Sequence, residues 1–170
     1  MTIEGIEAIH NFLKLSDRIA TAGQPSEEQF VAIKEAGYQI IVNLAPPGST
    51  NAIPHEREIV ESLGLQYIYV PVTWAKPTFG HLDQFFPVVI ENAEIPIFIH
   101  CAKNMRVSVF MYLYRRLYDR WDDQQAKSDL HKIWIPNETW QEFIQQVIYW
   151  YRPIMMIDDP NTIEFRNFWL

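Results

Sequence analysis

The chain carries the stretch Ile95-Pro-Ile-Phe-Ile-His100-Cys101-Ala-Lys-Asn-Met-Arg106-Val-Ser108, which predicts a short apolar strand, a polar loop and the start of a helix. The loop opens with Cys101, the only cysteine in 170 residues, and closes with Arg106. Because a helix start offers free backbone N–H groups and the positive end of a dipole, we expect the thiol to ionise readily and an oxyanion to bind beside it.

A cysteine and an arginine at the two ends of such a loop suit chemistry on a phosphate-like group. We expect the backbone N–H groups of residues 102–106 to surround the equatorial oxygens, and Arg106 to offer a planar fork to the same dianion. These parts predict attack by the thiolate of Cys101, a phosphocysteine intermediate and its hydrolysis. The expected binding residues are His100, Ala102, Lys103, Asn104, Met105 and Arg106.

The rest of the chain alternates apolar runs with segments of helical periodicity. Strands are expected near residues 17–22, 38–44, 65–72 and 95–99, and helices follow each of them. This order predicts an α/β fold with a central, mostly parallel sheet of four to five strands flanked by helices. Ligands bind at the carboxyl ends of strands in such sheets, which is where Cys101 falls. Residues 1–15 resemble an amphipathic lead-in, and Pro87 is expected to kink or split its helix.

Length and composition suit one domain over residues 1–170, because 48% of the chain is hydrophobic and no long linker interrupts it. Beyond residue 118 we expect extra C-terminal helices, with Trp140 and Phe143 at core spacing. The 14% aromatic content is compatible with a homodimer.

The charge and cysteine counts exclude several function classes. Lys and Arg number 14 against 21 Asp and Glu, so the formal charge of −7 argues against nucleic acid or an anionic membrane as partner. One cysteine cannot form an internal disulfide, and no leader or membrane-spanning run is visible, so we expect a cytoplasmic protein. The five histidines have no paired spacing, so we expect neither a metal nor another cofactor.

His100-Cys101-x4-Arg106 resembles the signature loop of the cysteine-dependent (dual-specificity and tyrosine) phosphatases, in particular a poorly characterised bacterial branch with this short spacing. The segments that share this resemblance are Asn11-Phe12, Leu15-Ser-Asp17, Thr21-Ala-Gly-Gln-Pro-Ser26, Ile41-Val-Asn-Leu44 and Gly64-Leu-Gln-Tyr-Ile-Tyr-Val-Pro71. It covers a core of about residues 8–118, and the helical extension over 119–170 has no counterpart in it. The resemblance implies that Cys101 is the nucleophile and Arg106 the phosphate ligand, and that Ser108 or Asn104 steadies the thiolate or the loop.

The chain departs from the wider superfamily at several positions. Most members have five residues between Cys and Arg and a loop glycine, whereas this chain has four residues and Asn104. The superfamily also places an aspartate about thirty residues before the cysteine as proton donor, but residues 70–77 contain no acid. Asp83 is the nearest candidate acid, with His81 beside it.

Three functions follow from these residues. The first is a phosphatase acting on a phosphorylated small molecule or phosphoprotein, with phosphotyrosine, phosphothreonine, nucleotides and inositol phosphates all open as substrates. The second is a catalytically weak phosphate-binding or regulatory module, suggested by the missing acid. The third is a rhodanese-like sulfurtransferase, because rhodanese loops also separate Cys and Arg by four residues.

Overall fold

A five-stranded sheet forms the centre of the structure, a computed structural model that describes the backbone of residues 5–155 and the side chains of residues 5–152. The strands are β1 (Leu13–Lys14), β2 (Ile19–Ala22), β3 (Ile40–Asn43), β4 (Gln66–Tyr69) and β5 (Ile97–His100). Their order across the sheet is β1-β2-β5-β3-β4, and only the β1–β2 pair is antiparallel. The predicted α/β fold with a mostly parallel sheet is therefore confirmed.

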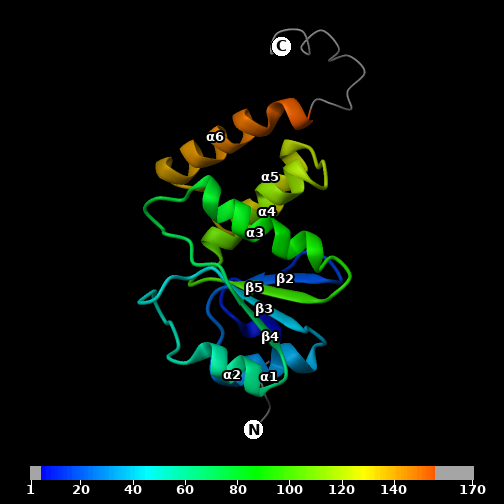
Figure 1. The fold of residues 1–170 in the computed structure, drawn as a ribbon, viewed down its shortest axis with the longest axis vertical. Helices are drawn as coiled ribbons and strands as arrows, with labels where there is room; N and C mark the ends of the chain where they lie inside the picture. Colours follow the sequence, from blue (N-terminus) through cyan, green and yellow to red (C-terminus); the bar gives the residue numbers. More distant parts are fainter. Residues whose placement is uncertain (1–4, 156–170) are drawn as a thin grey trace.

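Helices cover both faces of this sheet (Figure 1). On one face lie α1 (Glu27–Glu35), α2 (Glu56–Ser62) and the short 3-10 helix η1 (Ile6–Ala8). On the other face lie α3 (Phe79–Glu91) and α4 (Met105–Leu117), with α5 (Asp123–Ile133) and α6 (Glu138–Met155) packed outside them. Residues 156–170 of the expected C-terminal extension lie outside the described residues.

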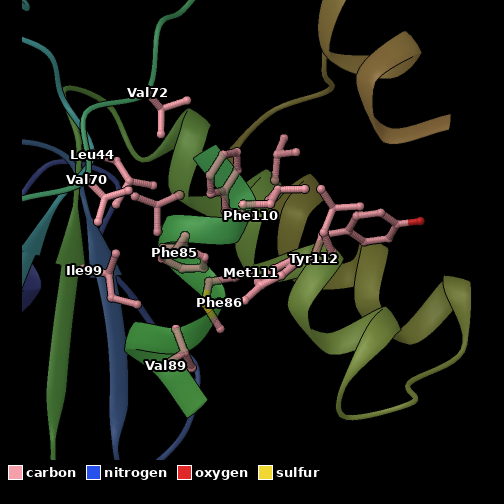
Figure 2. Packing of buried hydrophobic residues seen from close by; sticks show 14 of the residues in the cluster. Leu44, Val70, Val72, Phe85, Phe86, Val89, Ile99, Phe110, Met111 and Tyr112 are labelled. Carbon is pink, nitrogen blue, oxygen red and sulfur yellow. The ribbon is translucent and has the colours of Figure 1, made fainter. Parts of the chain in front are cut away.

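Side chains of β5 alternate between the two faces. Ile97, Ile99 and Cys101 belong to the core under α3 and α4, whereas Phe98 lies in the core on the α1 and α2 side. Figure 2 shows Ile99 pointing from the sheet toward Phe85 and Phe86 of α3, with α4 beyond them. The two cores pack against both sides of β5 and thereby fix the start of the loop that follows it.

The lead-in expected over residues 1–15 packs on the domain in its described part, through Ile6, Ile9 and Phe12. It contains η1, which ends at Ala8, and the edge strand β1 at Leu13–Lys14. Pro87 does not split its helix, since α3 runs unbroken over Phe79–Glu91. Pro87 is exposed, but Phe86 and Val89 beside it are buried, and their packing holds the helix through the missing hydrogen bond.

Candidate active site

The loop of residues 101–104 leaves β5 in the middle of the sheet, between β2 and β3, and runs into α4. The N–H of Cys101 donates to the carbonyl of Ala22 at 3.3 Å, which continues the parallel pairing of β2 and β5 by one residue. The side chain of Cys101 is 1% exposed. Only a small group can therefore reach the thiol.

The carbonyl groups of the loop are all held from outside it. The Ala102 carbonyl accepts from the N–H of Gln24 at 3.1 Å, and the Lys103 carbonyl from Nδ2 of Asn11 at 3.0 Å. The Asn104 carbonyl accepts the N–H of Ser108 at 2.9 Å. Nδ1 of His100 lies 3.3 Å from the Cys101 carbonyl. The Met105 carbonyl accepts from Nε1 of Trp134 at 3.1 Å and from Oγ of Ser108 at 2.9 Å.

These contacts fix the direction of the N–H groups. In a planar trans peptide the C=O and N–H point to opposite sides, so each carbonyl turned outward turns the next N–H inward. No hydrogen bond among the described residues is donated by the N–H groups of Ala102, Lys103, Met105 or Arg106. Successive N–H groups at the start of a helix form a binding site for an anion.

Asn104 gives the loop its sharp turn. Its φ of 64° lies in the left-handed region, which asparagine tolerates better than most residues. Its buried Nδ2 donates to the carbonyl of Asn11 at 2.8 Å and to Oγ1 of Thr21 at 2.9 Å. The side chain therefore fills the position of the usual loop glycine and also ties the loop to the N-terminal segment.

Gly23 allows this segment to approach the loop. A Cβ at this position would lie 2.8 Å from the carbonyl oxygen of Ala102 and 3.0 Å from that of His10. Both atoms belong to backbone and cannot easily move. The Gly-Gln-Pro-Ser segment is thus one wall of the loop.

Arg106 lies in the first turn of α4 and is 8% exposed. Its guanidinium carbon lies 5.5 Å from the ring centroid of Trp74, and its Nε has no hydrogen-bond partner among the described side chains and backbone. A buried, unpaired guanidinium N–H is costly in a protein interior. Arg106 thus has unused capacity to bind an anion beside the loop.

Two tryptophans from the C-terminal helices support Trp74. Nε1 of Trp140 donates to the Trp74 carbonyl at 3.1 Å, and the Trp134 ring lies 5.4 Å from the Trp74 ring. Trp74 itself is 37% exposed and lies in the segment of residues 70–77, which contains no acid. The sequence indicated Trp140 only as a core residue and gave no signal for Trp134.

His100 and Glu56 form a buried pair on the other face of the sheet from Cys101. Nε2 of His100 lies 3.1 Å from Oε2 of Glu56. Burial raises the pKa of Glu56, but hydrogen bonds from His100, Gln24 and Tyr67 outweigh it and hold that pKa below its usual value. The sequence gave no sign of Glu56, because a glutamate at a helix start is normally on the surface.

Asp83 is exposed on α3 and makes none of the loop contacts described above. The pKa of Tyr151 on α6 is raised first by burial, then by the neighbouring Tyr118, and least by the negative charge of Asp83. The other predicted residues lie in or next to the loop, and Asp83 takes no part in the contacts that hold it.

His81 lies closer to the start of α3 than Asp83 does. Its Nδ1 accepts the backbone N–H of Thr78 at 3.1 Å, and burial lowers its pKa.

Within the described residues no three His, Cys, Asp or Glu side chains gather as metal ligands. None of the helices that the structure describes could span a membrane.

A family model described as DSP-PTPase phosphatase fused to NAD+ kinase matches residues 8–145. The chain belongs to this phosphatase family. The matched residues include the whole loop, α4, α5 and both Trp134 and Trp140, so the family extends well past the expected core of about 8–118.

Solved structures of phosphatases share this fold. A candidate phosphatase (DUF442) from Shewanella putrefaciens CN-32 has a TM-score of 0.77 and 28% identity, covering 88% of this chain and 99% of that one. The core catalytic domain of the PP-IP phosphatase SIW14 from S. cerevisiae, in complex with citrate, has a TM-score of 0.67 and 21% identity, covering 95% of each chain.

Curated relatives are much longer proteins. The beta-lactamase hydrolase-like proteins of Xylella fastidiosa (strain Temecula1) and Agrobacterium fabrum (strain C58) are each 28% identical to this chain, over 123 and 122 residues. The match covers 69% of this chain in both cases, but the chain spans only 28% and 27% of the length of these relatives.

Proposed function

We propose that this protein hydrolyses a phosphomonoester through a phosphocysteine on Cys101. The observation that carries this proposal is the loop in which every carbonyl from residue 101 to 105 is held from outside, which leaves the N–H groups of Ala102, Lys103, Met105 and Arg106 free to bind an anion. Arg106 adds a positive charge beside them. Donors fixed in advance around the transferring phosphoryl group stabilise its transition state without reorganisation.

The reaction has two steps. The sulfur of the Cys101 thiolate attacks phosphorus, the bond from phosphorus to the leaving oxygen breaks, and the leaving group departs with the electron pair. Water then attacks the phosphocysteine, the P–S bond breaks, and orthophosphate and the thiolate are released. The loop N–H groups and Arg106 hold the phosphoryl oxygens through both steps.

The leaving group narrows the substrate class. Residues 70–77 contain no acid, and without a proton donor turnover falls by roughly 10²–10⁴ for leaving groups that need one. A leaving oxygen that is stable as an anion, such as that of an aryl phosphate, avoids this loss. Trp74, which is 37% exposed and lies next to Arg106, offers such a ring a stacking partner. The phosphorylated partner that we propose is accordingly an aryl phosphate, either small or on a protein.

Rapid-quench kinetics with 4-nitrophenyl phosphate tests this proposal. The wild type should release a burst of one phenolate per active site and carry one phosphoryl group on Cys101 after acid quench, and Cys101→Ser should do neither. Asp83→Asn should retain turnover if no acid is needed, and a large loss would make Asp83 the donor. Undiminished hydrolysis by Cys101→Ser would contradict the mechanism.

Two other outcomes correspond to the other functions. Phosphate binding without turnover would favour the binding or regulatory module, an outcome suggested by the acid-free segment before α3. Formation of thiocyanate from thiosulfate and cyanide would instead favour sulfur transfer through a persulfide on Cys101.

A further inference from the structure

Glu56 is a buried carboxylate surrounded by hydrogen-bond donors, although glutamate is seldom buried without partners. It lies in the first turn of α2 and is 6% exposed. Its Oε1 accepts from Nε2 of Gln24. Its Oε2 accepts from Nδ2 of Asn43 at 2.9 Å, from the hydroxyl of Tyr67 at 2.7 Å and from Nε2 of His100 at 3.1 Å.

Two hydrogen-bonded routes connect this carboxylate with the loop. Along the first, Glu56 binds His100, and Nδ1 of His100 lies 3.3 Å from the Cys101 carbonyl. Along the second, Glu56 binds the side chain of Gln24, and the backbone N–H of Gln24 donates to the Ala102 carbonyl at 3.1 Å. Glu56 is therefore the common partner of the residues that hold two consecutive loop carbonyls.

Both ring nitrogens of His100 face oxygen atoms that can only accept hydrogen bonds, namely the Glu56 carboxylate and the Cys101 carbonyl. Glu56 is kept ionised by its donors, which hold its pKa below the usual value against the effect of burial. Burial and then the charge of Glu56 raise the pKa of Tyr67, which therefore stays protonated and remains a donor.

We propose that Glu56 is a positioning residue of the active site, which keeps His100 doubly protonated and through it fixes and polarises the 101–102 peptide. Donation to the Cys101 carbonyl strengthens the N–H of Ala102 as a donor toward the thiolate and the bound oxyanion. This inference rests on the role of Cys101 in the proposed function.

The pair is enclosed by few other titratable groups. Tyr67 on β4 bonds Glu56 directly, and the charge of Glu56, after burial, raises the pKa of Tyr69 on the same strand. The ring of Phe30 on α1 meets the His100 ring edge-on at 6.0 Å, and Gln24 and Asn43 are uncharged. The charge on Glu56 is thus the main electrostatic partner of His100.

Alkylation of the thiol by iodoacetamide tests this proposal, because Cys101 is the only cysteine in the chain. In Glu56→Gln the rate of alkylation at pH 6–7 should fall by about tenfold, because the curve of alkylation rate against pH shifts by about one pH unit to higher pH. Glu58→Gln on the same helix, whose side chain is exposed, is the matched control and should leave the profile unchanged. A folded Glu56→Gln protein with the wild-type profile would overturn the proposal.

Nitrogen-15 NMR of the imidazole rings provides a second measurement that needs no variant of Glu56. The wild-type His100 ring, assigned with His100→Gln, should show two protonated nitrogens at pH 7. A neutral ring at pH 7 would overturn the proposal even if Glu56→Gln failed to fold. Neither measurement uses phosphatase turnover, so a protein without hydrolytic activity but with both signatures would refute the proposed function and leave this role of Glu56 standing.

Discussion

Replacing Asn104 by alanine or glycine separates its two contributions to the loop. Either change removes the amide that donates to Asn11 and Thr21, which at about 1 kcal/mol for each hydrogen bond lowers the free energy of unfolding by about 2 kcal/mol. Alanine must also adopt the φ of 64°, which costs about 1 kcal/mol more for a residue with a Cβ. Glycine adopts this φ without strain, although it gains entropy in the unfolded chain. We therefore expect losses of about 3 kcal/mol for alanine and about 2 kcal/mol for glycine.

Urea unfolding followed by tryptophan fluorescence measures these losses. Asn51 provides a matched control, because its φ is 62° but its side chain is exposed and has no hydrogen bond among the described residues. Asn51→Ala should cost only the conformational part, about 1 kcal/mol. If Asn104→Ala were as stable as Asn104→Gly, or if Asn51→Ala lost as much as Asn104→Ala, this reasoning would be refuted.

Three further changes test other parts of the site. Trp140→Phe removes the N–H that donates to the Trp74 carbonyl, so we expect the free energy of unfolding in urea to fall by about 1–2 kcal/mol. Acrylamide should also quench the fluorescence of Trp74 more strongly. Unchanged quenching would contradict this role of Trp140. Arg106→Lys removes the planar guanidinium, whose Nε makes no hydrogen bond among the described residues. Calorimetry should therefore show phosphate binding at least about tenfold weaker, while the free energy of unfolding changes by less than about 0.5 kcal/mol. Equal affinity for phosphate would argue against Arg106 as the ligand. Because the pKa of Glu56 in the folded protein is below 4.5, its ionised form contributes stability above pH 4.5 that is lost as the pH falls through this folded pKa. Between pH 3 and 6, the free energy of unfolding should therefore fall less steeply with decreasing pH in Glu56→Gln than in the wild type. Parallel curves of unfolding free energy against pH for the two proteins would contradict this.

The features that the sequence predicted are those with local causes. The apolar run before Cys101 specifies a strand, and helical periodicity after the first strand specifies a helix, each within a short stretch of chain. Cys101 and Arg106 are only five positions apart in the chain, so predicting their proximity needed no tertiary information. Parallel pairing followed from the alternation of strands and helices.

The features that it could not predict depend on distant residues. A glutamate at the start of α2 has the same local pattern whether it faces water or lies buried against His100. Trp134 contacts the loop because α5 packs on α4, and no periodicity in the chain encodes that contact. Asp83 as proton donor rests only on its distance along the chain from Cys101, and it stays a prediction.

The loop is supported by contacts between segments that lie far apart in the chain, and we expect such contacts to form late in folding. Asn11 and Lys103 are 92 positions apart, and Trp74 and Trp140 are 66 apart. Pairings of such long range form slowly, because the entropy of closing the intervening chain is lost before the contacts stabilise it. The same pairings are open to local unfolding, in which one support detaches while the sheet stays folded. Anion binding should therefore disappear before the secondary structure does, and a measured loss of binding under mild denaturant would report partial opening of the molecule.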